Sequence, residues 1–219
     1  MSLTSLLSIA RTALLAHQKA VDVTGHNIAN ANTEGFSRQR LVLEPQPPIQ
    51  TPIGQLGRGV AAVGVERIRD EFLDASYRRE NADLGRFTTL RDLLGRLESI
   101  FGEPSDSRLA VGIDQFLSAF GDLANDPTGG APRVLVVQAA QYLRQQFRDA
   151  ERRVGDVGQE VVARMQEAVS EINAIARQVA DFNIRIQSRA TGFRDAPDLK
   201  DQRDQLLDRL SSLMSVRVI

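Results

Sequence analysis

Residues 132–189 read PRVLVVQAAQYLRQQFRDAERRVGDVGQEVVARMQEAVSEINAIARQVADFNIRIQSR, with no proline after the first position. Apolar residues recur at steps of three and four along this stretch, which is the period of one face of an α-helix. A proline at the first position is typical of the first helical turn, where its missing N–H is not needed. The pattern predicts one helix of about 55 residues, roughly 80 Å long at ~1.5 Å per residue.

Two glycines lie near the middle of this pattern. Gly155 and Gly158 would each cost about 1 kcal/mol in a helix. A well-buried Val, Ile or Phe contributes about 1.5–3 kcal/mol, so a packed apolar seam outweighs both glycines. We expect the helix to continue, with a bend or partial break as the alternative.

Shorter helical patterns lie on both sides of the long one. Residues 70–101 carry Leu, Phe and Tyr at three- and four-residue steps, and Gly102 and Pro104 end the run. A short helix is expected before the turn at 125–130, and another from about 199 to 214. Aromatic residues make up only 5% and Trp is absent, which favours helices packed through Leu, Val, Ile and Ala. We predict a mainly α fold: an elongated antiparallel helical bundle or coiled coil.

The N-terminal region carries its own amphipathic pattern over residues 3–28. Apolar residues at seven-residue intervals give this helix a stripe that an isolated helix cannot bury, so it needs a partner surface. We name these residues the assembly seam: Leu3, Leu7, Leu14, Val21 and Ile28.

An asparagine-rich turn and an extended segment follow this helix. Asn27, Asn30 and Asn32 precede Gly35; Asn competes for backbone hydrogen bonds and Gly takes a positive φ without cost, so the helix should end here. Residues 36–69 contain alternating apolar positions and four clustered prolines, which favour extended structure and a small β-hairpin.

These patterns divide the chain into four segments. They are an amphipathic helix with its turn (1–35), an extended or β-hairpin connector (36–69), an elongated helical bundle (70–215), and a short apolar segment (216–219). The last segment resembles the start of a strand, so we expect the chain to stop before a β-rich domain.

Charge and composition exclude several classes of protein. The 27 Lys and Arg nearly balance the 28 Asp and Glu, which argues against a nucleic-acid binder. The absence of Cys excludes disulfides, thiolate metal sites and Cys nucleophiles. No segment reaches the ~18 apolar residues of a membrane span. No basic residue precedes the first apolar stretch, and Arg11 interrupts it, so a cleaved signal peptide is not expected.

The sequence offers no set of catalytic, cofactor-binding or metal-ligating residues. His17 and His26 are the only histidines, and their positions fit neither a metal site nor a catalytic triad. The glycine-rich stretch 54–59 lacks the Lys and Ser/Thr of a phosphate loop. Acidic pairs such as Asp201 and Asp204 are interpreted as solvated helix faces paired with nearby arginines.

One segment resembles a known protein family. The signature of bacterial flagellar axial proteins (rod, hook and hook-associated proteins) is Ala-Asn, two residues, Thr, one residue, Gly, an aromatic, Ser or Thr, and Arg. Residues 29–38 match this signature after an amphipathic helix, as in that family. Segments at 57–73, 116–139 and 199–207 are similar to the hook-associated members. The matching signature positions are Ala29, Asn30, Thr33, Gly35, Phe36, Ser37 and Arg38.

The resemblance implies a structural role outside the cell, in a ring of identical subunits at the junction between the flagellar hook and filament. The implied partners are the hook protein, a second junction protein and a flagellar export chaperone. Family members are exported through the flagellar type III channel, without a cleaved signal peptide.

Two alternatives remain from the residues themselves. A coiled-coil adapter or an amphipathic membrane-surface protein unrelated to flagella would use the same seam, and liposome sedimentation would separate the latter from a flagellar protein. An enzyme would need a pocket with convergent, perturbed groups, and the sequence offers no candidate set.

Overall fold

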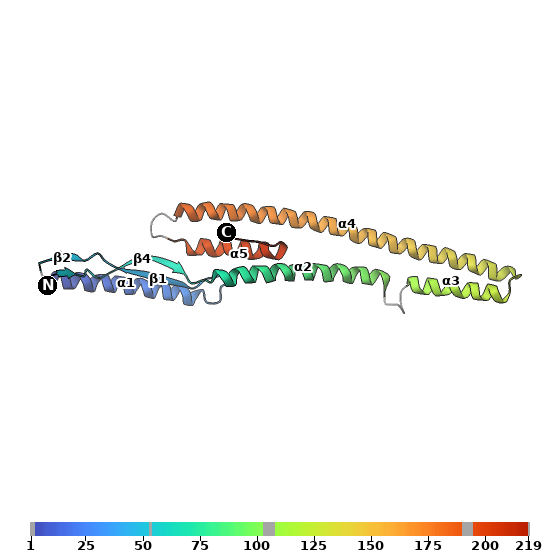
Figure 1. The fold of residues 1–219 in the computed structure, drawn as a ribbon, viewed down its shortest axis with the longest axis horizontal. Coiled ribbons are helices and arrows are strands. Elements are labelled where there is room, and N and C mark those ends of the chain that lie inside the picture. Colours follow the sequence, from blue (N-terminus) through green and yellow to red (C-terminus); the bar gives the residue numbers. More distant parts are fainter. Residues whose placement is uncertain (1–2, 53, 103–107, 190–194, 219) are drawn as a thin grey trace. The chain divides into compact units, whose positions relative to one another are not determined.

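The computed structural model describes residues 3–52, 54–102, 108–189 and 195–218. Its elements follow one another along the chain as in Figure 1. They are α1 (Leu3–Ala29), β1 (Gln39–Pro45), β2 (Ile49–Thr51), β3 (Gly54–Leu56), β4 (Val60–Arg67), α2 (Glu71–Phe101), α3 (Arg108–Asn125), α4 (Gly130–Arg189) and α5 (Pro197–Leu213). The predicted mainly α fold with a small β-hairpin is confirmed.

The helices begin and end close to where the sequence patterns place them. α4 contains 60 residues and continues through Gly155 and Gly158, as the energetic comparison predicted. Asp70 precedes α2, and its Oδ1 accepts hydrogen bonds from the backbone N–H groups of Phe72 and Leu73, which is N-terminal capping. Residues 215–218 form no strand. Within the described ranges, no helix is both long enough and apolar enough to span a bilayer.

The chain divides into two compact units. One contains residues 1–83 and 172–219, and the other contains residues 84–171. In the first unit β1 pairs antiparallel with β4, from Gln39 opposite Arg67 to Pro45 opposite Val60, with a bulge after Val42. β2 and β3 continue the hairpin towards its tip. Helix α1 contacts both β1 and β4, and Figure 1 shows it lying along them.

The apolar core of this first unit is small. Ile186 on α4 packs with Ala196 and Leu199 at the start of α5, and Phe182 lies against them. Other buried side chains of this unit are polar or charged. They are Ser37, Gln39, Arg78, Asp201, Asp204 and Ser211.

The second unit contains the C-terminal part of α2, all of α3 and the N-terminal part of α4. Ala119 is buried, and Gly112 lies where a Cβ atom would come within 3.3 Å of Leu143 on α4. Arg96 on α2 and Glu160 on α4 form an ion pair. These contacts join the three helices within this unit.

Candidate assembly site

Helix α1 has two different faces. Ala16 is buried, and Ile9, Thr12 and Val23 are half-buried on the side that contacts the β1–β4 sheet. The assembly seam lies on the opposite side, because its residues are about half a turn away from Ala16 around the helix. Its five side chains, Leu3, Leu7, Leu14, Val21 and Ile28, are between 59 and 80% exposed. The described part of the chain therefore leaves the seam uncovered.

The hairpin lies close to α1 at Gly59. Its φ is +95°, a conformation that residues with a side chain rarely adopt. A Cβ atom there would lie 2.2 Å from Thr12 Oγ1, and that hydroxyl donates a hydrogen bond to the Ile9 carbonyl at 2.8 Å. Gly59 therefore permits both the turn into β4 and the contact between hairpin and α1.

We predict that Gly59→Ala lowers the free energy of unfolding by about 1–3 kcal/mol, through backbone strain and the overlap with Thr12. Chemical denaturation followed by circular dichroism measures this loss. Gly54→Ala is the matched control, because Gly54 also has a positive φ but a Cβ atom added to it would meet no other atom within 4 Å. Equal losses in the two variants would mean that contact with α1 contributes nothing.

The signature residues build the turn that follows α1. Asn30 Nδ2 donates to the His26 carbonyl at 3.0 Å, and Thr33 Oγ1 donates to Asn30 Oδ1 at 3.2 Å. The Phe36 N–H then donates to the Thr33 carbonyl at 3.2 Å. Gly35 has a φ of +76°, and the Phe36 ring packs edge-on against His26 with centroids 5.3 Å apart. Ala29 ends the helix, and Arg38 is exposed.

Asn27 closes this turn, although its place among three asparagines predicts only that it helps to end the helix. Its Oδ1 accepts from the Gln39 N–H at 2.8 Å, and its Nδ2 donates to the Gln39 carbonyl at 2.9 Å. The side chain thus pairs with the first residue of β1 as a neighbouring strand would. Asparagine at a helix end is a common signal, so the sequence did not reveal this pairing.

Replacing Asn27 with alanine should leave both backbone groups of the buried Gln39 without these partners, at a cost of about 1–3 kcal/mol. The amide of Gln39 should then exchange with solvent roughly tenfold or more faster, which hydrogen-exchange NMR measures. Asn32→Ala, at an exposed position of the same turn, should leave that rate unchanged. An unaltered Gln39 rate in the Asn27 variant would contradict the assignment.

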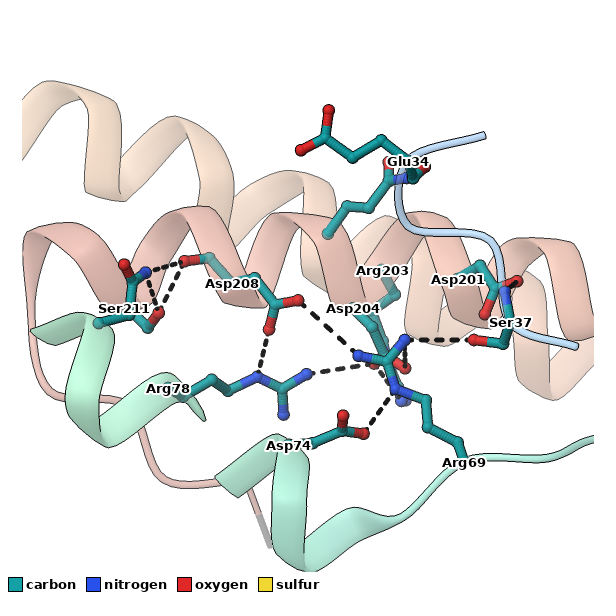
Figure 2. Close-up of polar contacts among 12 residues, drawn as sticks. Glu34, Ser37, Arg69, Asp74, Arg78, Asp201, Arg203, Asp204, Asp208 and Ser211 are labelled. Carbon is teal, nitrogen blue, oxygen red and sulfur yellow. Dashed lines mark hydrogen bonds and ion pairs between the residues drawn. The ribbon is translucent and has the colours of Figure 1, made fainter. Parts of the chain in front are cut away.

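The turn is held against α5, more than 150 residues later in the sequence. The Ser37 N–H donates to Asp201 Oδ2 at 3.0 Å, and Gln205 Nε2 donates to the Glu34 carbonyl at 2.7 Å. Gln39 Nε2 donates to Asp198 Oδ1 at 2.9 Å. Figure 2 shows Ser37 beside Asp201 on α5.

The interpretation of Asp201 and Asp204 as residues of a solvated helix face is wrong. Their exposed fractions are only 5% and 4%. Arg67 on β4 donates to both carboxylates at 2.8 Å. Because Arg67 lies 134 and 137 positions away along the chain, no pattern of neighbouring charges could identify it as their partner.

These pairs belong to a larger charge cluster, whose members other than Arg67 are labelled in Figure 2. Asp204 is its centre, with four arginines within 4 Å of its carboxylate: Arg67 at 2.8 Å, Arg203 at 3.0 Å, Arg78 at 3.8 Å and Arg69 at 3.9 Å. The charge cluster contains four arginines and four aspartates: Arg67, Arg69, Arg78, Arg203, Asp74, Asp201, Asp204 and Asp208.

The electrostatics of this cluster favour the ionised form of Asp204. Burial raises the pKa of this carboxyl. The hydrogen bonds and positive charges of Arg67 and Arg203 together lower it by more, so the pKa lies below its ordinary value. The pKa of Arg67 is raised, because its bonds to Asp201 and Asp204 outweigh the opposing effect of burial. The described residues contain no group of three or more His, Asp or Glu side chains arranged to hold a metal ion. The ion pairs of the cluster join β4, α2 and α5.

Comparison with known proteins adds an independent line of observation. The family described as "Flagellar hook-associated protein FlgK helical domain" matches residues 94–219, and the family "Flagella basal body rod protein" matches residues 7–36. The second match covers most of α1 and ends at Phe36 of the signature turn. The two matched ranges thus include four of the five seam residues and the signature up to Phe36, and helices α3 to α5.

Curated relatives resemble nearly the whole chain. Flagellar hook-associated protein 1 of Bacillus subtilis is 34% identical over 97% of the chain. The proteins of the same name from Salmonella typhimurium and Escherichia coli are 29% and 27% identical over 99% of it. The chain covers 43%, 39% and 40% of these three relatives, so it spans about two fifths of their length.

Proposed function

Because this chain belongs to the flagellar hook-associated protein family, we propose that it is a structural subunit at the junction between the flagellar hook and filament. The observation that carries the proposal is the assembly seam, whose five apolar side chains face away from the sheet and are mostly exposed. Apolar side chains of this kind stabilise the protein only when a neighbouring surface covers them and removes them from water.

The energetics favour assembly with several neighbours over a simple dimer. Full burial of the five seam side chains would contribute about 7–15 kcal/mol. Association itself costs about 4–15 kcal/mol in lost translational and rotational freedom. One seam contact is therefore of marginal stability. A closed ring or helical array, in which each subunit touches more than one neighbour, gives each subunit several such contacts.

The proposed role assigns a task to each part of the chain. Residues 1–35 are the assembly segment, 36–69 the connector and 70–215 the helical part, and Asn30, Thr33, Gly35 and Phe36 direct the chain out of the assembly layer. The proposed partners are identical subunits in a ring, the hook protein, a second junction protein and an export chaperone. The proposed location is extracellular, after export without a cleaved signal peptide. The family name and the match of residues 7–36 to a rod-protein family support this assignment.

Immunogold labelling of isolated flagella tests the proposal, with antibodies raised against the polar surface of α4. We expect gold particles in one narrow band between hook and filament. Labelling along the filament, or labelling of cell membranes without flagella, would contradict it. Sedimentation of the chain with liposomes provides a second measurement, because a membrane-surface protein would co-sediment through α1 whereas a junction subunit would stay in the supernatant.

A further inference from the structure

The joint between α5 and the segment formed by the signature turn, β4 and the start of α2 consists of charged and polar contacts. Arg67 on β4 contacts Asp201 and Asp204. Arg69 bonds Asp74 at 2.5 Å, lies 3.8 Å from Asp208, and donates to Ser37 Oγ at 3.3 Å. Figure 2 shows the Arg69 guanidinium between the α2 and α5 carboxylates and the turn.

Helix α2 contributes the second half of this joint. Arg78 Nε donates to Asp208 Oδ1 at 2.7 Å. Asn81 Nδ2 donates to the Asp208 carbonyl at 3.0 Å and to Ser211 Oγ at 2.8 Å. Arg78 is 7% exposed and Ser211 is fully buried. Both side chains therefore have little exposure to bulk solvent.

The apolar side chains that β4 and α2 bring to this joint are at most half-buried. In the described ranges, the buried apolar side chains come from α1, α3, α4, α5 and the residue before α5, and none comes from β4 or α2. Apolar contacts hold at any pH, whereas carboxylate–guanidinium contacts depend on the ionisation of the carboxylate. The attachment of this segment to α5 is therefore sensitive to protonation in a way that the helices are not.

We propose that the charge cluster is an acid-sensitive latch: it holds the signature turn, β4 and α1 on α5 at neutral pH and releases them when its aspartates are protonated. α1 moves with this segment because it packs on β1 and β4. The inference concerns contacts within one chain, so it does not depend on the proposed function.

The balance of charges in the cluster explains why the latch opens at low pH. At neutral pH four aspartates neutralise four arginines, and arginine keeps its charge at every accessible pH. Each protonated aspartate leaves an arginine without a counter-charge; the side chains of Arg67 and Arg78 are only 13% and 8% exposed, so the unpaired charge is costly. The pKa of Asp204 lies below its ordinary value, so its stabilising contribution is complete above the unfolded value of about 3.9 and is lost as the pH falls through the lower, folded value.

Other charged groups face the cluster from neighbouring positions. Glu66 pairs with Arg40, Lys200 pairs with Asp195 at 2.5 Å, and His26 lies 3.9 Å from Asp198. A cavity of about 620 Å³ adjoins the cluster, and its lining includes Arg67, Arg78 and Asp204. A cavity of this size holds water, so protons can reach the aspartates before the helices unfold. The remaining charged side chains that line it are Glu71, Arg79 and Arg217.

Distance measurement between two spin labels tests the latch. The chain contains no cysteine, so Ala31→Cys in the turn and Gln202→Cys on α5, both at exposed positions, create unique attachment sites. Double electron–electron resonance should give one narrow distance distribution at pH 7. As the pH is lowered stepwise from 7 to 2, we expect a broad distribution at longer distances to replace it while circular dichroism still shows the helices. A distribution that stays narrow down to pH 2 with the helices intact, or loss of the helices together with the release, would overturn the proposal.

A charge variant gives a second test at constant pH. In the labelled protein, Asp204→Asn should raise the ratio of released to latched molecules at pH 7 at least about tenfold, because it leaves buried arginines uncompensated. Asp181→Asn removes a carboxylate from an exposed pair with Arg185 outside the cluster and should change nothing. If the Asp204 variant behaves like the control, the latch is refuted. If the Asp204 variant does not fold, the pH series on the labelled protein with its cluster unsubstituted still tests whether the latch exists.

Discussion

Leu14→Asp is expected to abolish assembly into flagella while leaving the fold of the subunit intact. Leu14 is 72% exposed and lies on the α1 face that turns away from the sheet, so the free energy of unfolding should change by less than about 0.5 kcal/mol. In an assembled ring the same position would lose about 1.5–3 kcal/mol of apolar burial and would place a charge in an apolar contact. Incorporation should therefore fall at least about 100-fold.

The measurement is complementation of a strain that lacks the gene, scored by swimming and by electron microscopy of attached filaments. Ser8→Asp is the matched control, because it adds the same charge to an exposed position of α1 outside the seam. We expect normal filaments with this control and none with Leu14→Asp. Normal motility in the Leu14→Asp strain would refute the role of the seam.

Gly35→Val is expected to disrupt the signature turn more than any other single substitution in it. The φ of +76° is strained for every residue with a side chain and most strained for a β-branched one, at a cost of about 1–3 kcal/mol. A Cβ atom would also lie 1.9 Å from Gln205 Nε2 and 2.5 Å from Gln205 Cγ. Gln205 would have to leave the Glu34 carbonyl, which costs a further ~0.5–1.5 kcal/mol.

Urea denaturation measures this loss, and the complementation assay measures its effect on assembly. Gly57→Val is the matched control, since Gly57 does not have a positive φ and has open space around its Cβ position; its stability should change by less than about 0.5 kcal/mol. Gly35→Ala in a Gln205→Ala background separates the two causes, because the overlap is then absent and only the backbone strain remains. Wild-type stability of Gly35→Val would contradict both.

The elements that the sequence predicted well depend on local signals. Apolar residues recur along α4 without a gap, and their burial was expected to stabilise the helix by more than Gly155 and Gly158 destabilise it. The structure confirms one helix there. Prolines and alternating apolar residues between 36 and 69 indicated the hairpin that β1 and β4 form. The expected turn at Gly35 has the positive φ that the residue type favours.

Only part of the candidate site could be predicted from the sequence. The heptad spacing identified the exposed seam of α1, and the signature identified the turn. The residues that hold this turn in place were missed. Asn27 was treated as a helix-ending residue although it pairs with Gln39, and Asp201 and Asp204 were assigned to a solvated face although both are buried.

By itself, the sequence determined the helices, the hairpin, the apolar seam and the backbone conformation at Gly35, because each depends on residues within a few positions of one another. Only the tertiary structure decided which charges pair, that β4 and α2 meet α5 through arginines, and that Gly59 lies against Thr12. The physical reason is that the sequence around an arginine on β4 is the same whether that arginine is exposed to water or pairs with a carboxylate more than 130 residues away. Chain folding alone brings that carboxylate within hydrogen-bond distance and removes the competing water.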